Sequence, residues 1–499
     1  MIKHKKWKFS IKFSRIWRLT TTVVITFLLT FNFSWVATAA AKHYTDLQFE
    51  PLPEIKLPDY ERMVLDNGLV VYLMEDHELP LVSGTALIKT GSRLEPGNKI
   101  GLAEITGSLM RTGGTINHPP DQLNKILEQR AASVETNISE SAGNASFESL
   151  TEDLETVFGL FAEVLQKPAF TQEKLDLIKT QARGGIARRN DDPSNIASRE
   201  FKKLIYGDNS PYARTVEYAT LDEISRTDVV EFYQKYYSPN NMILGIVGDF
   251  NPKIMRSLIT EKLGKWQPNP NISNISIPEV SPAKLGGVFV VDQPQLTQSN
   301  ILIGHLGGKF DHPDYPALSI MNGVLNGFGG RLFNELRSRQ GLAYTVYGYW
   351  SSRFDYPGIF IAGGQTRSDA TVQFVKALES EIESIQQTKI TEKELNYAKE
   401  STLNSFVFNF QDPSQTLSRL MRYEYYGYPA DFLFLYQQAL QKTTTADVQR
   451  VAQKYLKPEN IVTLVVGNKT AIKPPLTQLA SQVTPIDITI ATEQTQAKN

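Results

Sequence analysis

An arginine and a tyrosine seven residues apart are the side chains of this sequence best placed to hold a ligand. Both lie in residues 329–350, GGRLFNELRSRQGLAYTVYGYW. Apolar residues at helical spacing predict a short helix that packs on one face and turns Arg337 to another. Gly341 should end that helix, because glycine readily adopts positive φ. A strand should follow, so that Arg337 and Tyr344 meet at one corner. The residues expected on one side of that strand are Tyr344, Val346, Gly348 and Trp350.

Metal chemistry has few candidate ligands. A zinc site needs several His, Cys or carboxylate ligands in one place. The chain has six histidines and no cysteine, and no two histidines stand at helical ligand spacing. The absence of cysteine also excludes disulfides, thiolate metal sites and a catalytic thiol. We therefore expect this chain to bind no metal or other cofactor of its own.

The overall charge excludes a large class of partners. The chain has 52 basic and 53 acidic residues, a net charge of −1, which gives no bulk attraction to nucleic acid or anionic lipid. Its 499 residues are too many for one hydrophobic core and predict several domains.

The first 41 residues have the composition of an export signal. Seven Lys or Arg residues precede an apolar run at residues 19–36, and the small residues 37–41, ATAAA, follow. The apolar run is also about as long as the shortest membrane spans, so an uncleaved anchor is the alternative. In either case we expect the rest of the chain to be exported, to a periplasm or an equivalent lumen.

The remainder reads as one unit used twice. Asp228-Val229, Gln234-Lys235-Tyr236 and Val247-Gly248 recur, each 219 residues later, as Asp447-Val448, Gln453-Lys454-Tyr455 and Val466-Gly467. A period of this length indicates a domain duplication and not a solenoid. Hairpin strands mixed with helices predict an α+β fold, with each copy a mostly antiparallel sheet packed on helices and the copies facing each other across a cleft. The expected domains are residues 42–266 and 284–469, with a linker at 267–283 and a loosely held tail at 470–499.

Two short motifs of this sequence resemble those of one protein family. The Leu-Arg and Leu-Ala-Tyr around Arg337 and Tyr344, together with Gly101-Leu102-Ala103 in the first copy, are similar to the pitrilysin/insulinase metallopeptidases, the inverzincins. In that family the matching Arg and Tyr belong to the substrate cleft, where they hold the peptide and help to stabilise the tetrahedral intermediate. The resemblance implies these roles for Arg337 and Tyr344. The alternative is that both residues are only structural: Arg337 would cap its own helix, and Tyr344 would pack at the start of the strand.

The same resemblance shows what the chain lacks. The family carries His-x-x-Glu-His directly after Gly-Leu-Ala, with two zinc ligands and a general base. Here Glu104, Gly107 and Ser108 occupy those positions. The third ligand, a Glu, should fall near Gly184-Gly185, where no carboxylate stands. An exposed Glu104 without metal or partner would stay ionised and inactive.

Two functions fit a chain that keeps the binding residues and has lost the metal site. In the first, it is the non-catalytic subunit of a two-subunit peptidase, and a partner of the same family carries the zinc. In the second, it is an inactive scaffold or peptide-binding protein of the cell envelope. A self-sufficient hydrolase would need a nucleophile and a base that the sequence does not offer.

A bound peptide would need a strand edge. The best candidate is the strand predicted at 133–141, beginning with Ser133, Val134, Glu135 and Thr136, which would pair with an extended peptide if it lies at a sheet edge and not inside the sheet. Gly329 and Gly330 would either let a peptide backbone approach closely or only begin the helix.

Overall fold

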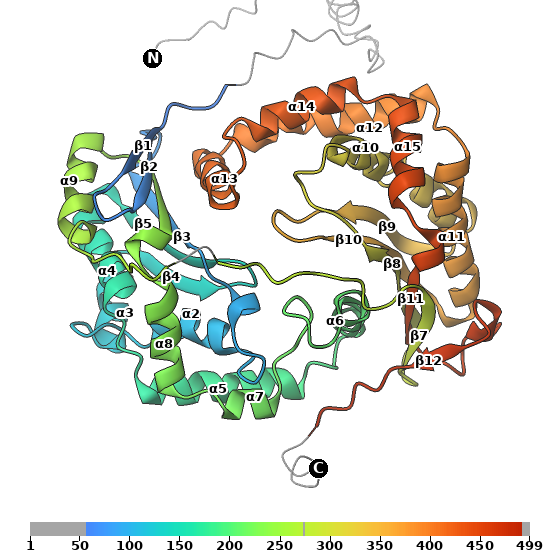
Figure 1. Cartoon of the computed structure of the whole chain (residues 1–499), viewed down its shortest axis with the longest axis horizontal. Coiled ribbons are helices and arrows are strands. Elements are labelled where there is room, and N and C mark those ends of the chain that lie inside the picture. The colour runs from blue at the N-terminus through green and yellow to red at the C-terminus, as the bar shows by residue number, and fades with distance from the viewer. Residues whose placement is uncertain (1–55, 273–274, 492–499) are drawn as a thin grey trace, which may run out of the picture. The chain divides into compact units, whose positions relative to one another are not determined.

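The computed structural model describes residues 56–272 and 275–491. The predicted signal or anchor at residues 1–41 lies outside the described residues. The described chain forms two copies, each built on one six-stranded sheet (Figure 1). Within these ranges no helix is long and apolar enough to cross a lipid bilayer.

The sheet of the first copy has the strand order β1-β2-β6-β3-β5-β4. Its strands are β1 (Glu61–Val64), β2 (Val70–Glu75), β3 (Leu81–Ile88), β4 (Ser133–Ile138), β5 (Gly143–Leu150) and β6 (Met242–Gly248). All neighbours pair antiparallel except β2 and β6, which are parallel. The hairpin predicted at residues 66–68 joins β1 to β2, and Gly68 has the positive φ (+85°) that this tight turn requires.

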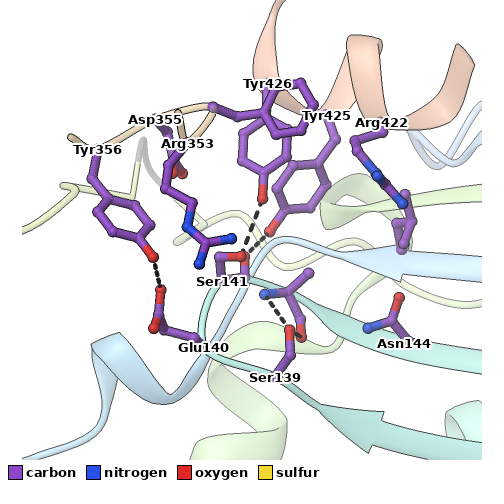
Figure 2. Close-up of a pocket in the computed structure, with 13 residues that line it drawn as sticks. Ser139, Glu140, Ser141, Asn144, Arg353, Asp355, Tyr356, Arg422, Tyr425 and Tyr426 are labelled. Atoms are coloured by element: carbon purple, nitrogen blue, oxygen red, sulfur yellow. Dashed lines mark hydrogen bonds between the residues drawn. The ribbon is translucent and has the colours of Figure 1, made fainter. Parts of the chain in front are cut away.

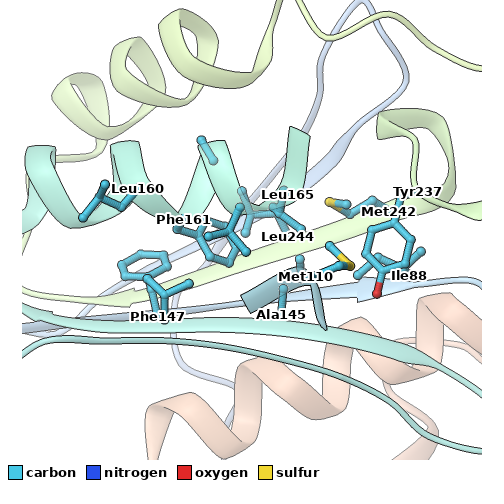
Figure 3. Packing of buried hydrophobic residues seen from close by; sticks show 14 of the residues in the cluster. Ile88, Met110, Ala145, Phe147, Leu160, Phe161, Leu165, Tyr237, Met242 and Leu244 are labelled. Atoms are coloured by element: carbon cyan, nitrogen blue, oxygen red, sulfur yellow. The ribbon is translucent and has the colours of Figure 1, made fainter. Parts of the chain in front are cut away.

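Helices cover one face of this sheet. The helices of this layer are α2 (Leu102–Thr112), α3 (Pro120–Glu128), α4 (Leu154–Gln166), α5 (Gln172–Ala187), α7 (Tyr218–Asp222), α8 (Arg226–Tyr236) and α9 (Pro252–Leu263). Figure 3 shows Phe161 and Leu165 of α4 above Phe147 and Leu244 of the strands, all buried in one apolar cluster. The rings of Phe147 and Phe161 lie 5.0 Å apart, so α4 is held by close aromatic packing.

The second copy repeats the plan. Its sheet has the order β12-β7-β11-β8-β10-β9. Its strands are β7 (Gly287–Asp292), β8 (Gln298–Leu306), β9 (Ala343–Ser351), β10 (Ile359–Arg367), β11 (Val462–Gly467) and β12 (Val483–Pro485). Its helices are α10 (Tyr315–Leu325), η5 (Phe333–Arg339), α11 (Thr371–Gln387), α12 (Glu392–Asn404), α14 (Phe432–Lys442) and α15 (Thr445–Tyr455). The α+β class, the two copies and the mostly antiparallel sheets predicted from the sequence are confirmed.

The repeated sequence signature has a structural cause. It covers α8 and β6 in the first copy and α15 and β11 in the second. Asp228 completes a capping box with Ser225 at the start of α8, and Asp447 does so with Thr444 at the start of α15. Both β6 and β11 are fully buried strands inside their sheets, so their residue types are tightly constrained.

Two helices are exchanged between the copies. Helix α6 (Pro193–Tyr206) belongs to the first copy by sequence but packs on β8 and β11 of the second, while α13 (Pro413–Tyr426) packs on β6, β2 and β3 of the first. Gly245 permits the second contact, because a Cβ there would collide with Met421 and lie 3.1 Å from Leu417. Each sheet therefore buries its second face with a helix from the other copy.

The C-terminal segment departs from the loose tail that its polar composition predicted. Ile472 and Leu476 are buried, and β12 pairs in parallel with β7. The side-chain amide of Asn190 also donates to the carbonyl oxygen of Ile488 at 2.7 Å. Residues 470–491 are thus held by the second sheet and by the first copy, through long-range pairing that local composition does not encode.

Candidate functional site

The positions of the family's zinc motif lie on α2. This helix begins at Gly101 (φ +104°), where the buried carboxylate of Glu95 accepts from the amides of Gly101 (3.1 Å) and Ala103 (2.8 Å). Burial raises the pKa of Glu95. Glu104 and Ser108 line a cavity of about 630 Å³ whose other walls come from α5, from Arg189 and Arg199, and from α7 with the segment before it. The helix that carries the motif in the family is therefore present, and the positions of its two histidines face a cavity.

Gly107, at the position of the general base, leaves no room for a side chain. A Cβ there would collide with the amide nitrogen of Ile138 and lie 2.7 Å from the carbonyl carbon of Asn137, both in β4. The Thr136 hydroxyl donates to the carbonyl oxygen of Gly107 at 2.6 Å. Helix α2 thus lies directly against β4, and backbone occupies the space of a catalytic glutamate.

The predicted position of the third ligand, unlike that of the general base, has room for a side chain. Gly184 and Gly185 lie in α5, and a Cβ on either would meet no atom within 4 Å. Gly185 faces the same cavity as Glu104 and Ser108. Within the described residues no group of three His, Cys, Asp or Glu side chains converges so as to hold a metal. Since this pocket offers one carboxylate, from Glu104, with hydroxyls but no imidazole, the donor set does not fit zinc.

The arginine and tyrosine of the second copy are brought together as predicted. Arg337 lies in η5, which is a π-helix, and its guanidinium stacks over the ring of Phe333 at 4.7 Å and over the ring of Tyr344 at 4.5 Å. Leu332 and Leu336 are buried beneath it, and Gly341 ends the helix with φ +62°. In the described structure the guanidinium makes no hydrogen bond or ion pair, so its N–H groups remain able to donate to a ligand.

The face of β9 that was predicted to carry Tyr344 is not buried along its whole length. The pairing with β10 shifts by one residue opposite Gly364 to Thr366, which is a β-bulge. Gly348 and Trp350 face the buried side, whereas Tyr344 is 80% exposed. The bulge lies beside Tyr344, whose ring stays against Arg337 of η5 while most of its surface is open to solvent.

The two glycines before η5 serve the turn. A Cβ at position 330 would collide with the carbonyl oxygen of Asn326, and one at position 329 would lie 2.8 Å from the ring of Tyr397. Both positions exclude a side chain because the protein's own atoms approach closely, which agrees with the interpretation that this pair begins the helix.

The strand predicted to accept a peptide, β4, is the outermost strand of its sheet. Its first four residues, Ser133 to Thr136, alternate between partly exposed and buried. The carbonyl oxygen of Val134 already accepts from Nε of Arg111 at 2.7 Å, and the carbonyl oxygens of Ser139 and Glu140 accept from backbone amides. Addition of a peptide to β4 stays a prediction, with part of the strand's hydrogen-bonding capacity already used.

A pair of asparagines, Asn322 in α10 and Asn326 directly after its last residue, was not among the predicted site residues. Asn322 accepts from the amide of Trp350 at 2.7 Å and donates to its carbonyl oxygen at 3.1 Å. In the same way, Asn326 accepts from the amide of Gly348 at 3.0 Å and donates to its carbonyl oxygen at 2.5 Å. These side chains imitate a neighbouring strand along β9, the outermost strand of the second sheet. Their spacing of four residues on one helix face was the available signal.

A duplicated α+β chain with a peptidase-like site that cannot hold its metal defines an inactive, metallopeptidase-like protein. The family model described as insulinase (peptidase family M16) matches residues 70–217, and that described as the peptidase M16 inactive domain matches residues 223–402. The chain belongs to the M16 peptidase family.

Relatives and solved structures agree with this assignment. The chain is 24% identical to the "non-peptidase homolog YmxG" of Helicobacter pylori, over 79% of this chain and 91% of that protein. It is 23% identical to the "uncharacterized zinc protease YmxG" of Bacillus subtilis, over 72% and 86%. The crystal structure of a peptidase M16 inactive domain from Pseudomonas fluorescens superposes with a TM-score of 0.75 at 25% identity, over 84% of this chain and all of that one.

Proposed function

We propose that this chain is the non-catalytic, substrate-binding subunit of a two-subunit zinc peptidase, exported to the periplasm or an equivalent lumen. The observation that supports the proposal is the contrast between its two sites. Arg337 keeps its donors free beside an outward Tyr344, while Gly107 has no space for a catalytic base. A partner of the same family, with His-x-x-Glu-His, would supply the zinc.

The geometry suggests how the pair would act. Asn322 and Asn326 occupy the outer backbone groups of Gly348 and Trp350. This leaves the start of β9, next to Arg337 and Tyr344, as the part of the described edge without such a cap. An extended polypeptide held there would place a carbonyl group near the guanidinium, which donates to oxygen in a fixed fork. Donors held in place before the reaction stabilise developing negative charge, and the loss of one typically costs about 100- to 1,000-fold in kcat.

The test uses the complex of the two subunits. The lone chain should bind no zinc and cleave no peptide, and activity should appear when the His-x-x-Glu-His partner is added. Arg337→Ala and Tyr344→Phe should each lower kcat while the complex still forms by size-exclusion chromatography. Arg339→Ala is the matched control, because Arg339 is 75% exposed, lies two residues away and pairs with Glu335. Stoichiometric zinc with activity in the lone chain would refute the proposal.

An inactive scaffold or peptide-binding protein of the cell envelope is the second candidate. The stacking of Arg337 between Phe333 and Tyr344 favours it, since the pair then has a structural role without any substrate. In that case Arg337→Ala would lower the unfolding temperature of the chain. The complex with this variant would then cleave peptides as fast as the wild-type complex, or neither complex would cleave them.

A further inference from the structure

Two cavities of about 430 Å³ each lie where the two copies meet. Their walls share Asp355, Tyr425 and Tyr426 from the second copy. In the first cavity, drawn in Figure 2, the hydroxyls of Tyr425 and Tyr426 point to Ser141 in the turn between β4 and β5 and bond to it at 2.5 and 3.1 Å. The second cavity is lined by residues after β3 and by isoleucines that follow α9. The tyrosine pair therefore forms a wall between two adjoining spaces.

The charged groups around these cavities are mostly positive. Four cations, Lys89, Arg93, Arg353 and Arg422, line them against two carboxylates. One carboxylate, Asp355, is neutralised by Arg93 at 2.8 Å, and the other, Glu140, accepts from the hydroxyl of Tyr356. Within the described residues the side chains of Lys89, Arg353 and Arg422 form no hydrogen bond or ion pair. Three cations therefore make no ion pair in the described structure and outnumber Glu140, the one carboxylate of these cavities that is not paired with an arginine.

Arg93 adds an observation that is independent of surface charge. Its side chain is only 3% exposed, and both Nε and Nη1 are buried without a hydrogen-bond partner. The hydroxyl of Thr90, which lines the same cavity, is likewise buried without a partner. Buried donors without a partner cost about 1–3 kcal/mol each, more for charged groups, so such positions commonly indicate a missing partner.

We propose that this junction binds an acidic segment of an extended polypeptide. Arg353 and Arg422 flank the tyrosine pair in Figure 2, so a ligand with carboxylates at more than one position suits them better than a single small anion. Asn144, on one side of that wall, offers its side-chain amide to a peptide backbone, whereas the amide of Asn240 on the other side is already bonded to Asn269. The inference rests on the proposed polypeptide-binding function and adds to it a preference for acidic sequences.

The test measures fluorescence polarisation of labelled peptides with the full chain. Three peptides of equal length are compared: one rich in Glu, one with Gln in place of every Glu, and one with Lys. We expect the Glu peptide to bind at least about tenfold tighter than the Gln peptide, and to lose most of that preference in high salt. The double variant Arg353→Gln, Arg422→Gln should abolish the preference. Arg256→Gln, an exposed arginine on α9 outside both cavities, is the matched control.

The variants avoid Arg93, whose removal would leave Asp355 unpaired in a partly buried site. Each protein is first checked for unchanged thermal unfolding. Equal binding of the Glu and Gln peptides would overturn the acidic preference and leave the proposed function intact, whereas failure to bind any peptide would count against the proposed function itself. Displacement of the Glu peptide by inorganic phosphate at comparable concentration would also overturn the inference, because it would indicate a site for a small anion.

Discussion

Replacement of Gly107 by alanine tests whether the position of the catalytic base is closed by the fold. Alanine is favoured over glycine inside a helix by about 1 kcal/mol, so at an unobstructed position the substitution should stabilise the protein. At position 107 the new methyl group would collide with the backbone of Ile138 and Asn137. The strand or the helix must then shift by about 1 Å, and overpacking of this kind costs typically 1–3 kcal/mol.

Gly184→Ala is the matched control. Gly184 also lies within a helix, but a Cβ there meets nothing within 4 Å, so this variant should gain up to about 1 kcal/mol. Urea unfolding followed by circular dichroism should therefore move the midpoint in opposite directions for the two variants. A Gly107→Ala protein as stable as Gly184→Ala would refute the claim that β4 closes the site.

Restoration of the zinc motif would meet the same obstacle at position 107. A chain carrying Glu104→His, Gly107→Glu, Ser108→His and Gly185→Glu has all the family's side chains in sequence. We expect it to be destabilised and to bind zinc weakly or not at all by isothermal titration calorimetry, because a glutamate forced in at position 107 must push α2 away from β4 and so displace the new ligands at positions 104 and 108. Tight stoichiometric zinc binding by this variant would show that α2 moves away from β4 at little cost.

Further predictions concern stability. Burial lowers the pKa of His305. Its ring lies against Trp350 and Phe360 and bonds to the carbonyl oxygen of Leu306 and the backbone amide of Lys457. The charges of Lys457 and Glu459 also face it. Protonation of His305 therefore favours the unfolded chain, and the stability provided by the neutral imidazole should be lost as the pH falls below about 6.5. In His305→Gln, the unfolding midpoint should depend less on pH between about pH 7.5 and 5.5. Asp314 has a pKa of about 2 and, despite burial that opposes the shift, is held ionised by hydrogen bonds from Tyr455, Arg450 and Lys454. Asp314→Asn should cost about 1 kcal/mol at neutral pH and clearly less near pH 2, where about half of the wild-type carboxyl groups have taken up a proton; an equal cost at both pH values would contradict this. Asn326→Leu should destabilise by about 1–3 kcal/mol, because both backbone groups of Gly348 lose their partner, and hydrogen exchange at the Gly348 amide should accelerate; unchanged exchange would argue against the cap.

Several features of the fold follow from local sequence. The capping boxes of α8 and α15, the turn at residues 66–68 and the buried strands β6 and β11 are fixed by residue types over a few positions. Since the same types recur 219 residues later, the amino-acid sequence alone reveals the duplication. It does not reveal the exchange of α6 and α13, because an amphipathic helix indicates that it buries one face but not which sheet it covers.

The candidate sites divide in the same way. The sequence by itself determined that this chain has no zinc motif, because no fold supplies an imidazole or a carboxylate that Gly107, Ser108 and Gly185 lack. It also determined that Arg337 and Tyr344 are neighbours, since a helix, a glycine stop and a strand start leave little freedom over seven residues.

Only the tertiary structure decided the rest. The pairing of β9 with β10 shifts at a bulge beside Tyr344, and the closure at Gly107 depends on how near α2 lies to β4. The pairing of Arg93 with Asp355 joins residues 262 positions apart, from different copies. The physical reason is common to all three. Each depends on the register and approach of segments distant in sequence, which the packing of the whole chain sets and local residue patterns do not specify.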